Sequence, residues 1–277
     1  MVDQATGFLG GRGTVVDMTL GAGGHAEALL RSGVGHLLGF DRDPAAIATA
    51  CARLSEFGGR VRATRARFSE VEVGEAVDGV LLDLGVSSMQ LDLPERGFGY
   101  RVDGPLDMRM EPQGPSARDL VNEASEQELE GFIREYGEEY RARRIARAIV
   151  RARERRPIET TDELARIVAG VLGKRPGGPH PARRTFQALR IAVNRELEEL
   201  AASLPRAVGF LAPGGRIVVI AYHSLEDRIA KRSLRGDPRL ETLTKKPLRP
   251  SEAEVTLNPR SRSARLRAAE RVAEAAA

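Results

Sequence analysis

Carboxylates stand at the ends of three apolar runs in this sequence, and a glycine-rich loop follows the first of them. Asp17, Asp41 and Asp83 each close such a run, and the loop occupies residues 21–24. Glycines let the backbone turn tightly and approach a ligand, while the free N–H groups of the next helical turn face that ligand. An acid about 20 positions after the glycines is placed to bind the hydroxyls of a ribose. These residues predict a nucleotide-type cofactor site.

The loop fits two cofactor templates. Gly21-x-Gly23-x-x-Ala26 matches a dinucleotide fingerprint and would indicate an NAD-dependent dehydrogenase. Asp17-x-x-x-Gly21-x-Gly23 matches an S-adenosylmethionine loop, in which the backbone and an acid hold the methionine end. A dehydrogenase gains nothing from a large arginine-rich insertion, whereas a methyltransferase that acts on nucleic acid needs such a surface. The methyltransferase is therefore the main hypothesis, with the dehydrogenase as the alternative enzyme.

Strand-like runs alternate with helical patterns along both ends of the chain. The runs lie at residues 14–16, 36–40, 60–65, 78–83 and 216–221, and segments near 240–245 and 263–269 could close the sheet as an edge pair. This alternation predicts a parallel α/β sheet whose ligands bind at the carboxyl ends of the strands. The first eleven residues show no periodicity and are expected to be an irregular start.

The α/β rhythm breaks in the middle of the chain. A glycine- and proline-rich passage runs from residue 84 to about residue 115, and residues 116–204 are helical in pattern. We expect two domains: a discontinuous cofactor-binding domain at residues 1–104 and 205–277, and a helical substrate-recognition insertion at 105–204.

Charge and composition limit the class of protein. The net charge of the 277 residues is only +4, but arginine crowds into residues 141–156, 174–195, 228–249 and 260–271. Such clusters suit a nucleic-acid phosphate backbone, or else are solvated faces; the tail arginines 260, 262, 265 and 267 fit either reading. The single Cys51 indicates a reducing compartment, and we expect a cytoplasmic protein with neither a membrane span nor a metal cluster.

Several long motifs together resemble the RsmH (MraW) family of bacterial ribosomal RNA methyltransferases. They are Gly23-Gly24-His25, Asp41-Arg42-Asp43-Pro44, 83–92, 105–110, Tyr136-Gly137-Glu138-Glu139, 180–189, 222–228 and Asn258-Pro259-Arg260-Ser261-Arg262-Ser263. The resemblance covers nearly the whole chain, from about residue 14 to residue 270. It implies a class I methyltransferase sheet (Rossmann-like, mostly parallel) with an inserted helical domain. It also implies S-adenosylmethionine as the methyl donor and N4-methylation of a cytidine in 16S rRNA, at the decoding centre of the small ribosomal subunit.

The resemblance also implies a set of cofactor-binding residues. They are Gly23, Gly24, His25, Asp41, Phe68, Asp83 and Gln90. Plainer roles compete with each: the glycines could only form a turn, the acids could only cap helices, and His25 could begin a helix without binding a ligand. Gln90 could be a surface loop residue, and Phe68, the weakest member, could belong to the core.

Two residues are candidates for catalysis. The amine of cytosine is a poor nucleophile because its lone pair is delocalised, so an enzyme must position N4 and accept a hydrogen bond from it. Asp83 is the candidate acceptor, although Asp83-Leu84-Gly85-Val86 lacks the prolines and the aromatic residue that many amino-group methyltransferases carry there. His223, after the next strand, could line the base pocket or be a buried structural histidine.

The resemblance does not extend to the start of the chain. Family members begin with a His-x-Pro-Val-Leu segment near the methyl-transfer site, whereas residues 1–13 lack that pattern. A non-catalytic RNA-binding or ribosome assembly factor with the same fold therefore stays open as a third reading.

Overall fold

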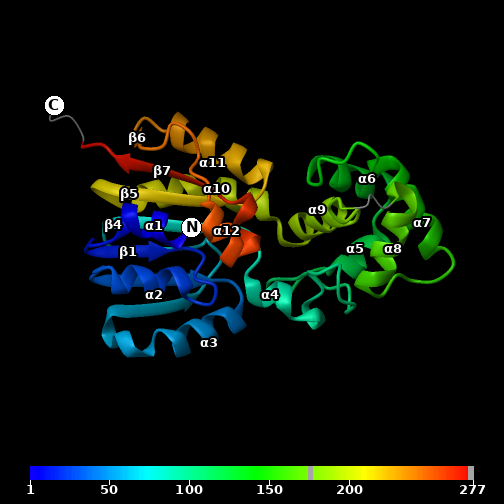
Figure 1. The fold of residues 1–277 in the computed structure, drawn as a ribbon, viewed down its shortest axis with the longest axis horizontal. Helices are drawn as coiled ribbons and strands as arrows, with labels where there is room; N and C mark the ends of the chain where they lie inside the picture. Colours follow the sequence, from blue (N-terminus) through cyan, green and yellow to red (C-terminus); the bar gives the residue numbers. More distant parts are fainter. Residues whose placement is uncertain (174–176, 274–277) are drawn as a thin grey trace. The chain divides into compact units, whose positions relative to one another are not determined.

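The computed structural model describes residues 1–173 and 177–273, which form two compact units (Figure 1). The sheet unit comprises residues 1–85 and 197–277, and the helical unit comprises residues 86–196. No helix in the described part of the chain is both long and apolar enough to cross a membrane.

The sheet unit is built on one seven-stranded sheet with the order β3-β2-β1-β4-β5-β7-β6. Neighbours among the first five strands pair in parallel, and β7 runs antiparallel between β5 and β6. The strands are β1 (Thr14–Asp17), β2 (His36–Asp41), β3 (Val61–Arg65), β4 (Val77–Asp83), β5 (Leu211–Ala221), β6 (Leu240–Thr242) and β7 (Arg265–Arg271). The predicted α/β sheet is confirmed, and the two C-terminal segments do close it.

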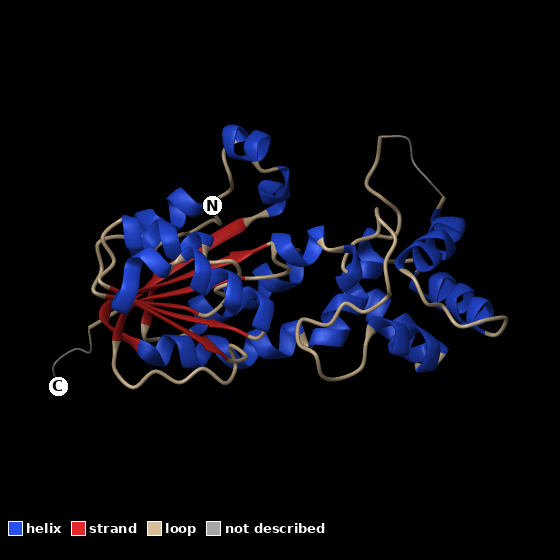
Figure 2. Ribbon diagram, turned by 90° about the horizontal axis from the view of Figure 1, so that it is seen from below, coloured by secondary structure: helices blue, strands red, loops and turns tan. Residues whose placement is uncertain are grey.

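Helices cover both faces of this sheet (Figure 2). Alternate strand residues enter opposite cores: Val16 and Leu82 pack on one side with α10, while Val15 and Leu81 pack on the other with α1 and α2. The strands read as continuous apolar runs because both faces are buried. The helices of this region are α1 (Val2–Leu9), α2 (Gly24–Arg31), α3 (Pro44–Arg53), α10 (Glu196–Phe210), α11 (Ser224–Gly236) and α12 (Glu252–Leu257).

Two of these helices bear on the sequence predictions. Asp43 caps α3, accepting a hydrogen bond from the N–H of Ala45, with Pro44 at the first helical position, as the sequence indicated. The expectation of an irregular start was wrong, because α1 is a regular helix that buries Ala5 and Leu9 against the sheet. Its two turns are too short for a clear apolar period, so tertiary packing decides its structure.

The helical unit has its own hydrophobic core. Its helices are α4 (Ser88–Asp92), α5 (Ala117–Glu123), α6 (Glu126–Glu135), α7 (Ala142–Arg153), α8 (Thr161–Leu172) and α9 (Arg183–Asn194). Ser116, Ser125 and Thr160 begin α5, α6 and α8 with capping boxes, in which an acid three residues later bonds back to the cap. The core is formed by apolar faces such as Ile145 and Ile149 of α7.

Packing places the unit boundaries earlier than the boundaries at 104/105 and 204/205 that the pattern predicts. Phe98 and Leu106, in the irregular passage, are buried in the core of the helical unit. Leu200 and Leu204, on α10, are buried in a core of the sheet unit. A periodicity argument misses both, because a loop that packs into a core has no repeat and α10 continues the helical pattern across the boundary.

Candidate active site

The glycine loop connects β1 to α2 with a backbone that favours glycine. Gly21 and Gly23 have φ angles of 52° and 78°, and Gly23 is the N-cap of α2. A Cβ atom on Gly23 would lie 3.3 Å from Leu54 Cδ1. The left-handed backbone and the close packing both require glycine at position 23, and they direct the first turn of α2 toward the strand ends.

A Gly23→Ala variant is expected to lose about 1–2 kcal/mol of folding free energy, because an L-residue is strained at this φ. The melting temperature should fall by roughly 2–8 °C. Gly131→Ala is the matched control, since a Cβ atom there meets nothing within 4 Å and Gly131 lies inside α6. An equal loss in both variants would contradict the strain argument.

Asp41, at the end of β2, organises the same loop. Its Oδ2 accepts a hydrogen bond from the N–H of Gly21 (2.8 Å), and its Oδ1 accepts one from the N–H of Asp43 (2.9 Å). Each carboxylate oxygen can accept a second hydrogen bond, so ribose hydroxyls can still be bound. Burial raises the pKa of Asp41, and the two backbone donors oppose that rise.

Asp83, at the end of β4, lies between a histidine and a tyrosine. His25 Nδ1 is 3.3 Å from Asp83 Oδ2, and the hydroxyl of Tyr222 donates to Asp83 Oδ1 at 3.0 Å. Burial raises the pKa of Asp83, while His25 and the Tyr222 hydrogen bond lower it. Burial and the neighbouring Asp83 charge raise the pKa of Tyr222, so its phenol stays protonated and donates. The site therefore holds an accepting carboxylate with a fixed orientation.

Tyr222 reaches Asp83 because Glu226, on α11, fixes the turn between β5 and α11. The buried carboxylate of Glu226 accepts hydrogen bonds at Oε2 from the N–H of Tyr222 (2.8 Å) and the N–H of His223 (3.2 Å). His223 in turn is the N-cap of α11, and its Nδ1 accepts from the N–H of Glu226. This capping box positions the tyrosine.

Thr19 joins Asp17 to Asp83. The N–H of Thr19 donates to Asp17 Oδ1 (3.0 Å), and the Thr19 hydroxyl oxygen accepts from the N–H of Asp83 (2.6 Å). Asp17 is 1% exposed, and burial raises its pKa to about 7. Its second oxygen, Oδ2, makes no hydrogen bond with any residue that the structure describes, and neither does the buried His25 Nε2.

These two unpartnered atoms fit the predicted cofactor. With Asp83 ionised, a neutral His25 carries its proton on Nδ1, facing Oδ2, so Nε2 presents a lone pair. Asp17 Oδ2 and His25 Nε2 are then both acceptors. The methionine end of S-adenosylmethionine carries an ammonium group with three N–H donors, which such acceptors suit. Buried acceptors normally have partners, and a cationic donor from a ligand would supply one.

The remaining predicted residues have contacts of their own in the structure. Phe68 follows β3 and is half-buried against the core that contains α10. Gln90 belongs to the helical unit, where it shares a capping box with Ser87 at the start of α4. His223 is almost buried, with Nε2 3.1 Å from Glu226 Oε1. Contacts of these three residues with cofactor or base stay predictions.

The capping role of His223 makes a testable prediction. His223→Asn should keep the melting temperature, because asparagine is a good N-cap, while His223→Ala should lose about 1 kcal/mol. Thermal melts of the two variants give this comparison. An equal loss in both would show that the imidazole ring, rather than the cap, stabilises α11.

Arg265 and Arg267 lie on a strand inside the sheet and pair with Asp227, so the reading as a solvated face of an edge strand is wrong for them. Arg267 is 6% exposed, and its Nε donates to Asp227 Oδ1 (2.7 Å), while Arg265 Nη1 lies 3.3 Å from Asp227 Oδ2. Burial alone would raise the pKa of Asp227, but the two arginines lower it. β7 lies inside the sheet, so these side chains stabilise α11 against it. Arg262 is exposed.

Two members of the cluster were missed in the sequence. Thr19 and Tyr222 each lie just after a strand, in β1's loop and in the turn after β5. Their positions just after a strand could have indicated both residues, because the carboxyl ends of neighbouring parallel strands meet at one edge of the sheet.

Comparison with known proteins identifies the family of this chain. Residues 5–272 match the model of the MraW methylase family. The chain is 52% identical to ribosomal RNA small subunit methyltransferase H of Methylobacterium sp. (strain 4-46), over 94% of this chain and 86% of the relative. It is 54% identical to the protein of the same name from Synechococcus elongatus, over 94% of this chain and 88% of the relative. The fold is accordingly that of a class I S-adenosylmethionine-dependent methyltransferase, and the chain belongs to the MraW methylase family.

Proposed function

We propose that this chain transfers a methyl group from S-adenosylmethionine to N4 of a cytidine in the 16S rRNA of the small ribosomal subunit. The observation that carries the proposal is the Asp83 carboxylate, held by His25 and Tyr222 beside the unpartnered Asp17 Oδ2. The names of the similar proteins support ribosomal RNA of the small subunit as the substrate.

The cofactor's contribution is an electrophilic methyl group on a sulfonium. Asp17 Oδ2 and His25 Nε2 would accept hydrogen bonds from its ammonium group, and the glycine loop would let the backbone approach it closely. Asp41 accepts hydrogen bonds from the ribose hydroxyls with the lone pairs that Gly21 and Asp43 leave free.

Asp83 acts on the amine of the target base. A free lone pair on either oxygen would accept a hydrogen bond from N4–H and so localise the nitrogen lone pair. As the bond from N4 to the methyl carbon forms and the methyl C–S bond breaks, the same oxygen would take the proton that N4 loses. A pKa raised by burial makes Asp83 a stronger acceptor than an exposed carboxylate. Tyr222 and His25 hold the carboxylate in one orientation before the base arrives.

The test uses small subunits from a strain that lacks the gene, incubated with the protein and methyl-labelled S-adenosylmethionine. Nucleoside analysis should find the label in N4-methylcytidine. Label in another nucleoside would overturn the assignment of the atom. Absence of label, with cofactor binding intact, would favour the non-catalytic assembly factor.

A further inference from the structure

The exposed side of α7 carries a row of arginines that the site described above does not use. Arg143, Arg147, Arg151 and Arg155, which we call the α7 arginine row, recur every fourth residue and are all exposed. Arg144 stands beside the first of them. The row covers the helix and one residue beyond its cap, with neighbours about 6 Å apart along the axis.

Most arginines of this row have no ion pair with any residue that the structure describes. Seven other arginines of the helical unit do have an acidic partner: Arg109, Arg118, Arg134, Arg156, Arg166, Arg184 and Arg190. In the row, only Arg147 has one, Glu126 at 3.5 Å. Arg143, Arg151 and Arg155 make no ion pair with any residue in the described ranges. Three of the four guanidinium groups in the row therefore carry a charge that no acid in the described ranges neutralises.

The row is unfavourable for the helix that carries it. Like charges four residues apart on a helix repel one another and destabilise it slightly. The pairs Arg143–Arg147 and Arg147–Arg151 both have this spacing. An anionic ligand would neutralise these like charges and remove the repulsion between them. Binding such a ligand is therefore a reason for an arrangement that destabilises the free helix.

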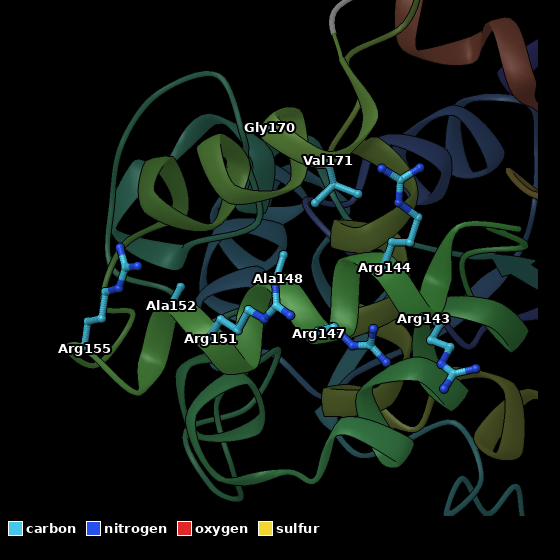
Figure 3. Close-up of a pocket in the computed structure, with 9 residues that line it drawn as sticks. All are labelled: Arg143, Arg144, Arg147, Ala148, Arg151, Ala152, Arg155, Gly170 and Val171. Atoms are coloured by element: carbon cyan, nitrogen blue, oxygen red, sulfur yellow. The ribbon is translucent and has the colours of Figure 1, made fainter.

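The row also borders an open groove of about 800 Å³. Ala148 and Ala152 of α7 lie between the arginines, and Gly170 and Val171 line the groove from the neighbouring helix α8 (Figure 3). Side chains this small leave room for a bulky ligand beside the guanidinium groups. A groove with arginines along one side and small or apolar residues on the other suits a polyanion that also has an apolar part, such as the sugar edge of a nucleic acid.

We propose that the α7 arginine row binds the phosphate backbone of a single RNA strand along this groove. The inference rests on the proposed function, because it takes RNA as the substrate. Guanidinium groups bind phosphate oxygens in a bidentate manner and stay charged at every physiological pH. Successive phosphates of one strand have a spacing comparable to the 6 Å or so between neighbouring arginines of the row.

An exposed aromatic ring at the start of α7 supports a single strand over a duplex. Tyr140 is 77% exposed, two residues before the helix, and the Arg141 guanidinium lies 5.3 Å from its ring centroid. Bases of single-stranded RNA stack on exposed aromatic and arginine planes, whereas paired bases are already stacked. Tyr140 therefore offers a platform for one base of the strand that the row holds.

The test measures binding of a fluorescent single-stranded RNA of mixed sequence to the full chain at several salt concentrations. The variant Arg143→Gln/Arg151→Gln/Arg155→Gln removes the unpaired members of the row. The slope of log Kd against log salt should flatten by about 2, and affinity at about 0.1 M salt should fall roughly 100-fold. Tyr140→Leu should weaken binding about 10-fold without changing the salt slope.

The matched control is Arg118→Gln/Arg134→Gln/Arg166→Gln, which removes the same charge from the same unit at paired positions. It should change the RNA affinity less than 3-fold. Equal weakening by both triple variants would show that net charge alone binds RNA and would overturn the proposal. So would wild-type affinity in the row variant. The binding test contains no methyl donor, so its result does not depend on catalysis. A protein that binds RNA through the row but transfers no methyl group in the labelling test would overturn only the proposed function.

Discussion

An Asp83→Asn variant is expected to lose about 10²–10⁴ in kcat, because the amide can no longer take up positive charge from the reacting amine. The change is nearly isosteric, and Oδ1 can still accept the Tyr222 hydrogen bond. Burial raises the pKa of Asp83, so removing the ionised form should stabilise the fold slightly at neutral pH. Single-turnover methyl transfer at saturating S-adenosylmethionine, with small subunits as substrate, measures the loss.

The control separates two roles that Asp83 could have. If Asp83 acts on the base, kcat should fall by a much larger factor in Asp83→Asn than the Kd for S-adenosylmethionine rises, because the amide affects the cofactor only through the tautomer of His25. Tyr222→Phe should lower kcat by a smaller factor, about 10-fold, because it removes only the group that orients the carboxylate. A large rise in Kd with unchanged kcat would instead make Asp83 a cofactor ligand and exclude it as the acceptor.

The sheet and the positions of its acids could be predicted because they depend on local patterns. Apolar runs of the right length defined β1, β2 and β4, and Asp17, Asp41 and Asp83 each occupy the last position of their strand. Parallel pairing then brings these points to one edge of the sheet, so the approximate site followed from topology alone.

The roles of individual side chains within the site could not be predicted in the same way. Tyr222 donates to Asp83, from which it is separated by 139 positions, and the contact depends on Glu226 fixing the turn after β5. Nothing in the sequence near His223 distinguishes a capping histidine from one that lines a pocket, because both follow a strand and precede a helix. Such contacts depend on tertiary packing.

The ion pairs of the surface arginines could not be predicted from the sequence either. The sequence shows arginines crowded into residues 141–156. Only the structure distinguishes Arg156, which pairs with Glu163, from Arg151 and Arg155, which have no acidic partner among the described residues.

The affinity for S-adenosylmethionine should depend on pH through Asp17, whose pKa burial raises to about 7. Only the ionised carboxylate binds the cofactor's ammonium group well. Below about pH 7 the Kd should therefore rise about tenfold per pH unit, and above it the Kd should level off. Calorimetric titrations from about pH 6 to pH 8 give the profile. Asp17→Asn should bind S-adenosylmethionine more weakly than the wild type at about pH 8. Position 17 should then contribute nothing to the change of Kd with pH.

Ionisation of Asp17 has opposite effects on cofactor affinity and on folding stability. Measuring both therefore tests the assignment more strictly than either measurement alone. The folded-state pKa of Asp17, about 7, lies above its unfolded value, so the stabilisation is complete below about pH 4 and is lost as pH rises to 7. Asp17→Asn should therefore raise the melting temperature by several degrees at about pH 8, with a gain of up to about 4 kcal/mol, and much less at about pH 5. When a buried charge serves to bind a ligand, its neutral variant should be more stable and should bind the ligand less well. A loss of stability at both pH values would mean that Asp17 supports the loop through Thr19 instead.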